Sequence, residues 1–264
     1  DPANKVLVIR EFADLEKARS AGHLAVIAGN EGGKILGSDP SLIDAWFPMG
    51  LRHVQFNWAM PNRLGASQDQ ENDPSQPGLT EFGRTTIENM NEKGMIVDVS
   101  HSAPRTILDA LDVTNKPILN SHSGGRSIAD KPQNLYDDQI EAMADNGGVI
   151  GVHFCSRLVL GVNGIQAGID DVVKQIRYVA DVGGIDVVGL GPDWLLGDPV
   201  RDVPYLRNTN QEDLTWAKGL EDSSDLPNLW DPLVGAGFTA GEIEKIAGGN
   251  MLRLFKDVLP GGND

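Results

Sequence analysis

The stretch from Gly94 to Ser123, GMIVDVSHSAPRTILDALDVTNKPILNSHS, decides the fold. It holds two apolar runs, MIVDV and PIL, each too short for an ordinary helix and each followed by Ser-His, with a helix-like segment between them. This pattern predicts a strand, a helix and a second, parallel strand. Because parallel strands are buried on both faces, the polar residue after each apolar run marks the point where the strand emerges. His101 and His122 occupy that point on successive strands, so either they converge on one metal ion or each hydrogen-bonds a neighbouring loop.

The same alternation extends through most of the chain. Apolar runs that end in polar residues recur on both sides of this unit, with helix-like segments between them. We therefore expect one α/β domain over residues 1–264 with a parallel sheet, in which Lys5–Arg10 (KVLVIR) is a candidate additional strand. In parallel barrels the functional side chains come from the carboxyl ends of the strands. Six successive strands deliver the following residues to that position: Glu31, Asn57 or Trp58, His101, His122, His153 and Asp193.

Local signals set the limits of several elements. Thr80 is an expected N-cap, Thr239 begins a capping box, and Asn250 is expected to cap the last short helix. The run from Leu24 to Gly33, LAVIAGNEGG, is expected to be a single strand that ends at Glu31.

The composition is that of an acidic globular protein. The chain has 264 residues, 40% of them hydrophobic, a formal net charge of -16 and a pI near 4.6. This charge repels phosphate backbones and anionic membrane surfaces, so we expect neither a nucleic acid nor a membrane partner. Cys155 is the only cysteine, which excludes an internal disulfide and a CxxC zinc site. The sequence has no apolar run of the roughly 18 residues that a transmembrane helix needs, and we expect a soluble protein of the cytoplasm or the periplasm.

Two long segments lack regular periodicity. Residues 59–78 are rich in Asn, Gln, Ser, Asp and Pro, and residues 195–235 contain Trp216 and Trp230, which we interpret as packing residues. Loops of this length in compact domains are usually active-site covers or disordered, and we favour covers. The sequence starts at Asp1 without a methionine or a leader, which leads us to expect processing or truncation.

The residues at the strand ends suit hydrolysis by an activated water. One carboxylate and two imidazoles, from Glu31, His101 and His122, are ligands that Zn²⁺ or a similar metal accepts. A metal there would lower the pKa of water to roughly 7 and polarise a carbonyl oxygen. The spare carboxylate of Asp193 would take the proton of the attacking water and pass it to the leaving nitrogen. This set of residues predicts a metal-dependent hydrolase.

The chain resembles the membrane dipeptidase (renal dipeptidase) family of zinc hydrolases in an ordered series of segments: AVIAGNEGG, PGLTEFGR with GMIVDVSH, PILNSHS, KPQNL with GGVIGVHF, DVVGLGPDW and GFTAGEIEKIAGGNMLRLF. They follow the family's order across nearly the whole chain. The resemblance implies a (β/α)8 TIM barrel that binds two zinc ions bridged by a glutamate and cleaves dipeptides and related small amides. It also implies roles for four residues: Glu31 matches the bridging carboxylate, His101 and His122 match the two histidines of the second zinc, and Asp193 matches the catalytic aspartate.

The sequence departs from the family at the first zinc. The family's first strand supplies a His-x-Asp pair for this ion, and no such pair occurs here. We therefore expect an N-terminally incomplete barrel with about six strands, in which the strands containing Val26 and Val188 present open edges. The chain alone should hold at most one metal, lack peptidase activity, and self-associate or misfold unless the N-terminal part is supplied.

Further departures concern the substrate. Trp58 stands where the family has a substrate-contacting histidine, Gln133 where it often has an arginine for the substrate carboxylate, and Cys155 where a tyrosine is common. Together with Arg126 and His153, Trp58 and Gln133 are the candidate substrate-binding residues.

Two alternatives to a dipeptidase-like hydrolase stay open. One is a catalytically inactive barrel used for binding, and the other is a metal-dependent amidohydrolase for another small amide or ester. Gln133 cannot reproduce the bidentate grip of a guanidinium, and Trp58 adds an apolar face. We expect a full-length version to prefer substrates with a hydrophobic or blocked end over plain dipeptides, unless Arg126 or Arg157 holds the free carboxylate. The expected partner is a small dipeptide or amide, and a homo-oligomer is left open.

Overall fold

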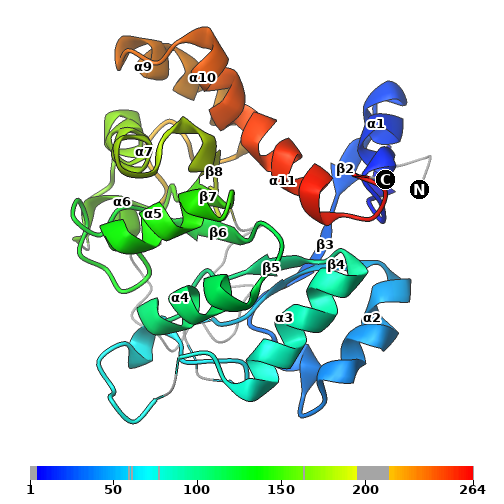
Figure 1. Cartoon of the computed structure of the whole chain (residues 1–264). Helices are drawn as coiled ribbons and strands as arrows, with labels where there is room; N and C mark the ends of the chain where they lie inside the picture. Colours follow the sequence, from blue (N-terminus) through cyan, green and yellow to red (C-terminus); the bar gives the residue numbers. More distant parts are fainter. Residues whose placement is uncertain are drawn as a thin grey trace. The chain divides into compact units, whose positions relative to one another are not determined.

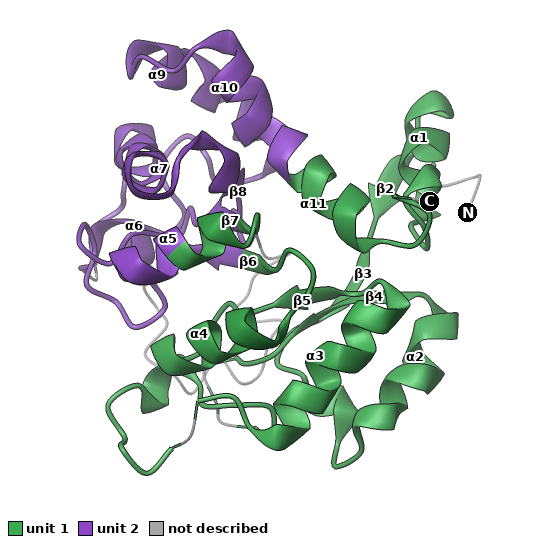
Figure 2. Ribbon diagram, viewed as in Figure 1, with its two compact units in different colours: residues 1–120, 142–149, 251–264 green, residues 121–141, 150–250 purple. Residues whose placement is uncertain are grey.

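The structure is a computed structural model that describes residues 5–58, 60, 62–76, 78–162, 164–194 and 214–263. Two segments were expected to be irregular covers, residues 59–78 and residues 195–235. Positions 59, 61 and 77 of the first and residues 195–213 of the second lie outside the described residues. The chain forms two compact units (Figure 2). Unit 1 comprises residues 1–120, 142–149 and 251–264, and unit 2 comprises residues 121–141 and 150–250.

Parallel strands in sequential order make up the larger of two sheets (Figure 1). Its order is β3-β4-β5-β6-β7-β8, the order of consecutive strands in a (β/α) barrel. The alternating α/β architecture predicted from the apolar runs is confirmed, with six strands in this sheet of the described chain. They are β3 (Ala28–Asn30), β4 (Leu51–Gln55), β5 (Ile96–Asp98), β6 (Leu119–Ser123), β7 (Val149–Val152) and β8 (Val188–Leu190).

The run from Leu24 to Gly33 is not the single strand that we expected. It forms β2 (Leu24–Val26) and then β3, and β2 pairs with β1 (Val6–Val8) in a separate two-stranded sheet. Val26 therefore lies outside the large sheet: it is opposite Val8, and its carbonyl accepts the Ile9 N–H at 2.8 Å. At this end of the strand order the edge strand of the large sheet is β3. Val188 does lie on an edge strand of the large sheet as the structure describes it, since β8 is last in the order.

Helices connect the strands as the alternation predicts. The α-helices are α1 (Ala13–Ser20), α2 (Ile43–Met49), α3 (Glu81–Lys93), α4 (Pro104–Val113), α5 (Asp137–Asp145), α6 (Ser156–Leu160), α7 (Ile169–Gly183), α9 (Trp230–Gly235), α10 (Ala240–Glu244) and α11 (Asn250–Val258). Short 3₁₀ turns are η1 (Lys34–Leu36), η2 (Pro40–Leu42), η3 (Gln68–Gln70), η4 (Ile185–Val187) and η6 (Ser223–Leu229). The end of the segment expected to be irregular is therefore helical.

Helix α3 begins and ends where the sequence indicates. The Thr80 hydroxyl accepts the Gly83 N–H, and Gly94 closes the helix at φ 72°, a left-handed conformation that favours glycine. Ile87 and Met90 are fully buried and face the sheet side, which makes α3 an amphipathic cover. The capping box at Thr239 is also present, at the start of α10.

Asn250 does not cap the last helix. Its backbone is helical, with φ -66° and ψ -40°, and it follows a π-turn, η7 (Lys245–Gly249). The side-chain amide instead donates to the carbonyl oxygens of Ile185 and Val188, both at 2.8 Å. Asn250 therefore fastens the start of α11 to β8, because a buried carbonyl at a strand start needs a donor.

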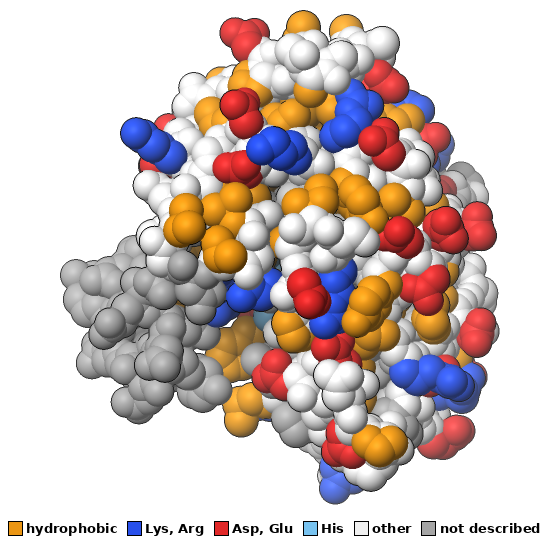
Figure 3. Space-filling model, turned by 90° about the vertical axis from the view of Figure 1, so that its left-hand side faces the viewer, with side chains coloured by type: hydrophobic (Ala, Val, Ile, Leu, Met, Phe, Trp, Pro, Cys, Tyr) orange, Lys and Arg blue, Asp and Glu red, His pale blue; other side chains and the backbone are white. Residues whose placement is uncertain are grey.

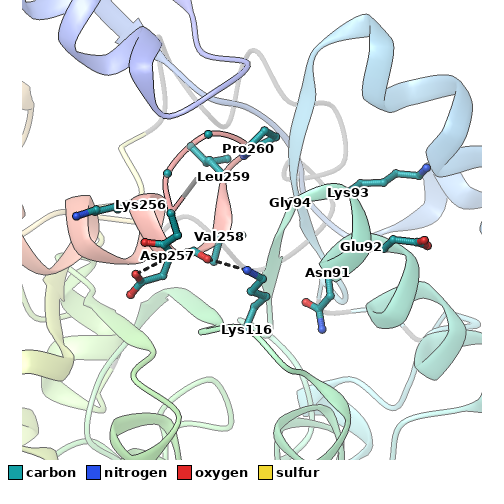
Figure 4. Close-up of a pocket in the computed structure, with 13 residues that line it drawn as sticks. Asn91, Glu92, Lys93, Gly94, Lys116, Lys256, Asp257, Val258, Leu259 and Pro260 are labelled. Carbon is teal, nitrogen blue, oxygen red and sulfur yellow. Dashed lines mark hydrogen bonds between the residues drawn. The ribbon is translucent and has the colours of Figure 1, made fainter.

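The core of unit 1 lies where α11 meets the sheet. Leu254, Val258 and Leu259 pack in one buried cluster with Ile96 of β5 and Leu119 of β6. A hollow of about 240 Å³ opens beside the end of α11 (Figure 4).

Lysines, acidic residues, asparagines and glycines are among the residues that line this hollow, and none of the lining residues is a candidate site residue. Lys116 donates to the Asp257 carbonyl at 3.2 Å, while Lys93 points out of the hollow and pairs with Asp44 at 2.5 Å (Figure 4). A lysine on the last carbonyls of a helix stabilises its C-terminus, which explains these contacts without a ligand.

The outer surface carries charges of both signs. On the face drawn in Figure 3, acidic and basic side chains are interspersed with apolar ones. Among the described helices, none has the length and apolar character needed to cross a membrane.

Candidate active site

Glu31 lies in the turn after β3, in unit 1, and three hydrogen bonds hold this turn. The Gly32 N–H donates to the Gln55 carbonyl at 3.1 Å, and the Asn62 amide donates to the Gly32 carbonyl at 2.9 Å. The Gln55 side chain donates to Glu31 Oε1 at 3.3 Å and to the Asn57 carbonyl at 2.7 Å. The Glu31 side chain is still 47% exposed, so its carboxylate is oriented by the protein and accessible to a ligand.

His101 follows β5 in the same unit, and its imidazole Nε2 lies 3.6 Å from Glu31 Oε1. The side chain is 8% exposed. Its backbone has φ 62°, and only Lys5 and Asp193 share a positive φ among the described residues other than glycine. Left-handed backbone costs an L-residue roughly 1–2 kcal/mol, and such residues are concentrated at functional sites because the surrounding structure must enforce them.

His122 lies in β6, within unit 2, and its ring is oriented by its neighbour. The Ser121 hydroxyl lies 2.7 Å from Nδ1, so Nε2 is the ring nitrogen that faces away from this contact. The Gln133 amide donates to the His122 carbonyl at 3.2 Å, and the Ser123 hydroxyl donates to the Gln133 carbonyl at 2.6 Å. Gln133 is 5% exposed, so its amide supports the backbone of His122.

Asp193 and His153 form an ion-pair contact in unit 2. His153 Nε2 lies 3.3 Å from Asp193 Oδ2, and the two side chains are 4% and 40% exposed. Asp193 has φ 54°. A Cβ on Gly191 would lie 2.0 Å from the Ser121 carbonyl, so only glycine allows the segment that carries Asp193 to approach β6 this closely.

Two tryptophans hold the backbone around Asp193. The Trp216 indole donates to the Pro192 carbonyl at 2.9 Å, and the Trp194 indole donates to the Leu220 carbonyl at 2.9 Å. Trp194 also packs edge-on against Phe154, with ring centroids 5.7 Å apart. Trp216 is therefore more than a packing residue, since its N–H fixes the residue that precedes Asp193.

The remaining candidate substrate residues have different surroundings. Trp58 is half-buried in unit 1, and its Cβ lies 3.4 Å from the position that a Cβ on Gly32 would take, which puts it beside the Glu31 turn. Arg126 in unit 2 pairs with Asp130 at 2.8 Å and stacks on the Tyr136 ring at 4.4 Å. Its guanidinium would have to exchange these contacts for a substrate carboxylate.

Cys155 is buried in unit 2 beside Arg157. Burial raises the pKa of the Cys155 thiol, and the charge of Arg157 acts in the opposite direction. A thiol with a raised pKa stays protonated near neutral pH, so Cys155 is a poor nucleophile.

His53 has a partner that the sequence did not reveal. Its Nε2 lies 2.8 Å from Asp98 Oδ2, across the β4–β5 pair in unit 1. Asp98 is fully buried and also accepts the Ser100 N–H at 2.9 Å. This contact between neighbouring strands gives His53 a structural role.

Sequence reasoning missed the residues that support the candidate ligands. Two of them contact a candidate side chain directly: Gln55 donates to Glu31, and the Ser121 hydroxyl lies against the His122 ring. The other two, Asn62 and Trp216, donate to the carbonyls of the residues next to Glu31 and Asp193. Gln55 left only a weak signal in the sequence, because its strand, LRHVQ, holds two further polar residues, Arg52 and His53. The other three depend on contacts between distant segments or on a ring orientation.

The fold and these side chains define a class. Sequential parallel strands with carboxylate and imidazole groups at their carboxyl ends are the arrangement of barrel enzymes. The chain belongs to the membrane dipeptidase family, Peptidase family M19, whose model matches residues 2–260.

Relatives agree with this assignment. An uncharacterized dipeptidase of Schizosaccharomyces pombe is 32% identical over 235 residues, which cover 89% of this chain and 53% of the relative. A dipeptidase of Aspergillus oryzae is 28% identical over 239 residues, with 90% of this chain and 53% of the relative covered. The chain thus spans about half the length of the curated relatives it matches.

Solved structures are similar over nearly the whole chain. An amidohydrolase from Pseudomonas aeruginosa has a TM-score of 0.88 at 25% identity, with 97% of this chain and 79% of that chain covered. A metallopeptidase from Rhodobacter sphaeroides, solved with a phosphinate mimic of the dipeptide L-Ala-D-Ala, has a TM-score of 0.82 at 22% identity, with 97% and 69% covered. The second likeness is one of fold.

Proposed function

We propose that the protein is a metal-dependent hydrolase that cleaves dipeptides or related small amides. The observation that carries the proposal is the Glu31 carboxylate 3.6 Å from the His101 imidazole, at the exits of β3 and β5, with His101 in a left-handed conformation. Membership of the dipeptidase family supports the same reaction class.

Glu31, His101 and His122 are the proposed metal ligands. A Glu-His-His set has the chemistry to hold a metal ion, and we propose zinc, which accepts carboxylate oxygen and imidazole nitrogen. The contact of Ser121 with His122 Nδ1 supports Nε2 as the donor atom, since metal-bound histidines usually engage the other ring nitrogen in a hydrogen bond. Glu31 would be the shared carboxylate if a second ion binds.

The metal would supply Lewis acidity for the attack of water on a carbonyl. In our proposal, Asp193 takes the proton of the attacking water and delivers it to the nitrogen of the bond that breaks. Its 40% exposed side chain, on a backbone held by Trp216 through Pro192, supports this role.

Substrate recognition is proposed to fall to Trp58, Gln133 and Arg126. Trp58 would offer an apolar face beside the Glu31 turn. Gln133 supports the His122 carbonyl and cannot grip a carboxylate with two parallel N–H groups. A substrate with a hydrophobic or blocked end therefore fits better than a plain dipeptide. The likeness to an amidohydrolase at 25% identity favours, as a second candidate, cleavage of another small amide.

Zinc content tests the ligand assignment. We expect zinc in the purified wild-type protein and its loss, at equal free zinc, from Glu31→Ala and His122→Ala, because two remaining ligands leave the shell incomplete. The matched control is His23→Ala, a half-buried histidine just before β2. Equal zinc in all four proteins would refute the assignment.

A panel of free dipeptides, N-acylated and C-amidated dipeptides and simple amides tests the reaction. In the full-length protein we expect turnover of blocked or hydrophobic members that is lost in Asp193→Ala. Turnover confined to small free dipeptides, unchanged in Arg126→Gln and Arg157→Gln, would contradict the proposed preference.

A further inference from the structure

The two ring nitrogens of His153 have different partners, and one of them fixes the proton. His153 Nδ1 accepts the backbone N–H of Cys155 at 2.8 Å. A backbone N–H can only donate, so Nδ1 must present its lone pair. In the neutral imidazole the proton therefore sits on Nε2.

That nitrogen contacts Asp193. Nε2 lies 3.3 Å from Asp193 Oδ2, and a protonated Nε2 can donate to a carboxylate that comes within reach. The Asp193 side chain is 40% exposed while that of His153 is 4% exposed. The imidazole thus holds the carboxylate from its buried side and leaves it accessible from solvent.

The ring itself has little freedom. The His153 backbone N–H donates to the Ser123 carbonyl at 2.8 Å, which fixes the end of β7 against β6. The His122 ring packs edge-on against the His153 ring, with centroids 5.6 Å apart and an interplanar angle of 69°. A ring that is held by a backbone hydrogen bond at one nitrogen and by packing against a neighbouring ring keeps a fixed orientation. Such a ring can in turn orient the side chain that it contacts.

We propose that His153 is a positioning residue for Asp193, and that it acts through its Nε2–H rather than by touching the substrate. This role of His153 rests on the proposed function in one respect, which is that Asp193 transfers the proton. Asp193 gains a proton as the water O–H bond breaks and loses it to the leaving nitrogen as the C–N bond breaks. His153 keeps its Nε2 proton throughout and takes no part in the transfer.

This role differs from substrate binding in what a substitution changes. A misplaced proton carrier slows the chemical step, on the order of 10- to 100-fold, with little change in KM. A lost substrate contact raises KM. His153→Leu should therefore lower kcat on the best substrate of the panel. His153→Gln should restore a part of it, because its amide nitrogen can donate near the place of Nε2.

The matched control is His53→Gln, which replaces the other histidine that pairs with an aspartate, His53 with Asp98. We expect it to lower the free energy of unfolding and leave kcat within about twofold, since that pair is sealed between β4 and β5. A raised KM with unchanged kcat in His153→Leu, or no difference between the Leu and Gln variants, would overturn the proposal.

The state of the ring gives a readout that needs no substrate. In long-range ¹H–¹⁵N spectra of ¹⁵N-histidine-labelled protein at pH 8, assigned with His153→Gln, His153 should carry its proton on Nε2. Asp193→Ala should shift the Nε2 resonance and leave Nδ1 in place, while Asp98→Ala should shift His53 and not His153. A proton on Nδ1 of His153 would overturn the proposal. If no panel member is hydrolysed, the proposed function is refuted. The ring spectra then decide on their own whether His153 orients Asp193.

Discussion

Two histidine–aspartate pairs occur in different parts of the chain, and they are built in opposite ways. His53 and Asp98 lie 2.8 Å apart on adjacent strands, with an aspartate that is fully buried. His153 and Asp193 lie 3.3 Å apart after the ends of β7 and β8, with an aspartate that is 40% exposed. Asp98 sits inside a regular strand, whereas Asp193 has φ 54°.

The comparison teaches that a short distance between charged partners does not mark a functional pair. The closer pair has its carboxylate sealed and satisfied by a second donor, the Ser100 N–H, so it can only stabilise the β4–β5 contact. The looser pair combines access to solvent with an unfavourable backbone. Solvent access and an enforced backbone conformation are why we propose Asp193, rather than Asp98, as the reacting carboxylate.

The largest effect that separates the pairs is expected from Asp193→Asn. The amide keeps the shape but cannot take a proton, so kcat should fall about 10²- to 10⁴-fold. The free energy of unfolding should change little, since Asn tolerates left-handed backbone. Steady-state kinetics beside urea unfolding checks both. A kcat within threefold of wild type would remove Asp193 from the mechanism.

Asp98→Ala should have the converse effect. It leaves the His53 ring and the Ser100 N–H without their buried acceptor, which should lower the free energy of unfolding by about 3 kcal/mol. Urea unfolding measures this, with Asp130→Ala, whose carboxylate is exposed, as the control. In whatever protein remains folded, zinc content and kcat should match wild type. A fall in kcat without a fall in stability would make the sealed pair functional and break the comparison.

A smaller effect is expected from Gln55→Leu, which removes the donor that orients Glu31. Loss of such support typically lowers metal affinity about 10- to 100-fold. Zinc competition titrations of the folded variant test this. Gln139→Leu is the control, because Gln139 is a buried glutamine in α5 that contacts Tyr136. Unchanged affinity in Gln55→Leu would show that Glu31 needs no orientation from β4.

The smallest effect should come from Ser121→Ala, which frees Nδ1 of His122. We expect zinc affinity to fall about tenfold, the lower limit for loss of a partner of a ligand histidine. The same titration applies, with Ser20→Ala on the surface of α1 as the control. An increase in affinity would mean that Ser121 holds the ring in the wrong orientation for the metal.

Much of this arrangement was predictable, because apolar runs record burial along the chain. Glu31, His101, His122, His153 and Asp193 each follow such a run, and the structure puts each one at or just after the end of a strand. Strand ends could be predicted since burial on both faces makes the run continuous.

What the sequence could not reveal depends on contacts between distant segments. The run Leu24–Gly33 is divided into β2 and β3 because β2 pairs with Val6–Val8, and no local sequence pattern predicts this pairing. Asn250 reads locally as a cap, yet its amide binds carbonyls 62 and 65 positions earlier in the chain. The direction of the His153 ring follows from one backbone N–H, so residue type alone does not determine it.

The left-handed backbone at His101 and Asp193 has a consequence for how this protein would change under selection. A library screened only for heat resistance should accumulate glycine at His101 and asparagine or glycine at Asp193, since these relieve backbone strain that L-residues otherwise bear. The variants selected would melt later and would lack the two side chains to which we assign metal binding and proton transfer. Thermal ranking of variants would therefore favour the loss of the site, and any engineering of this chain must hold these two positions fixed before it begins.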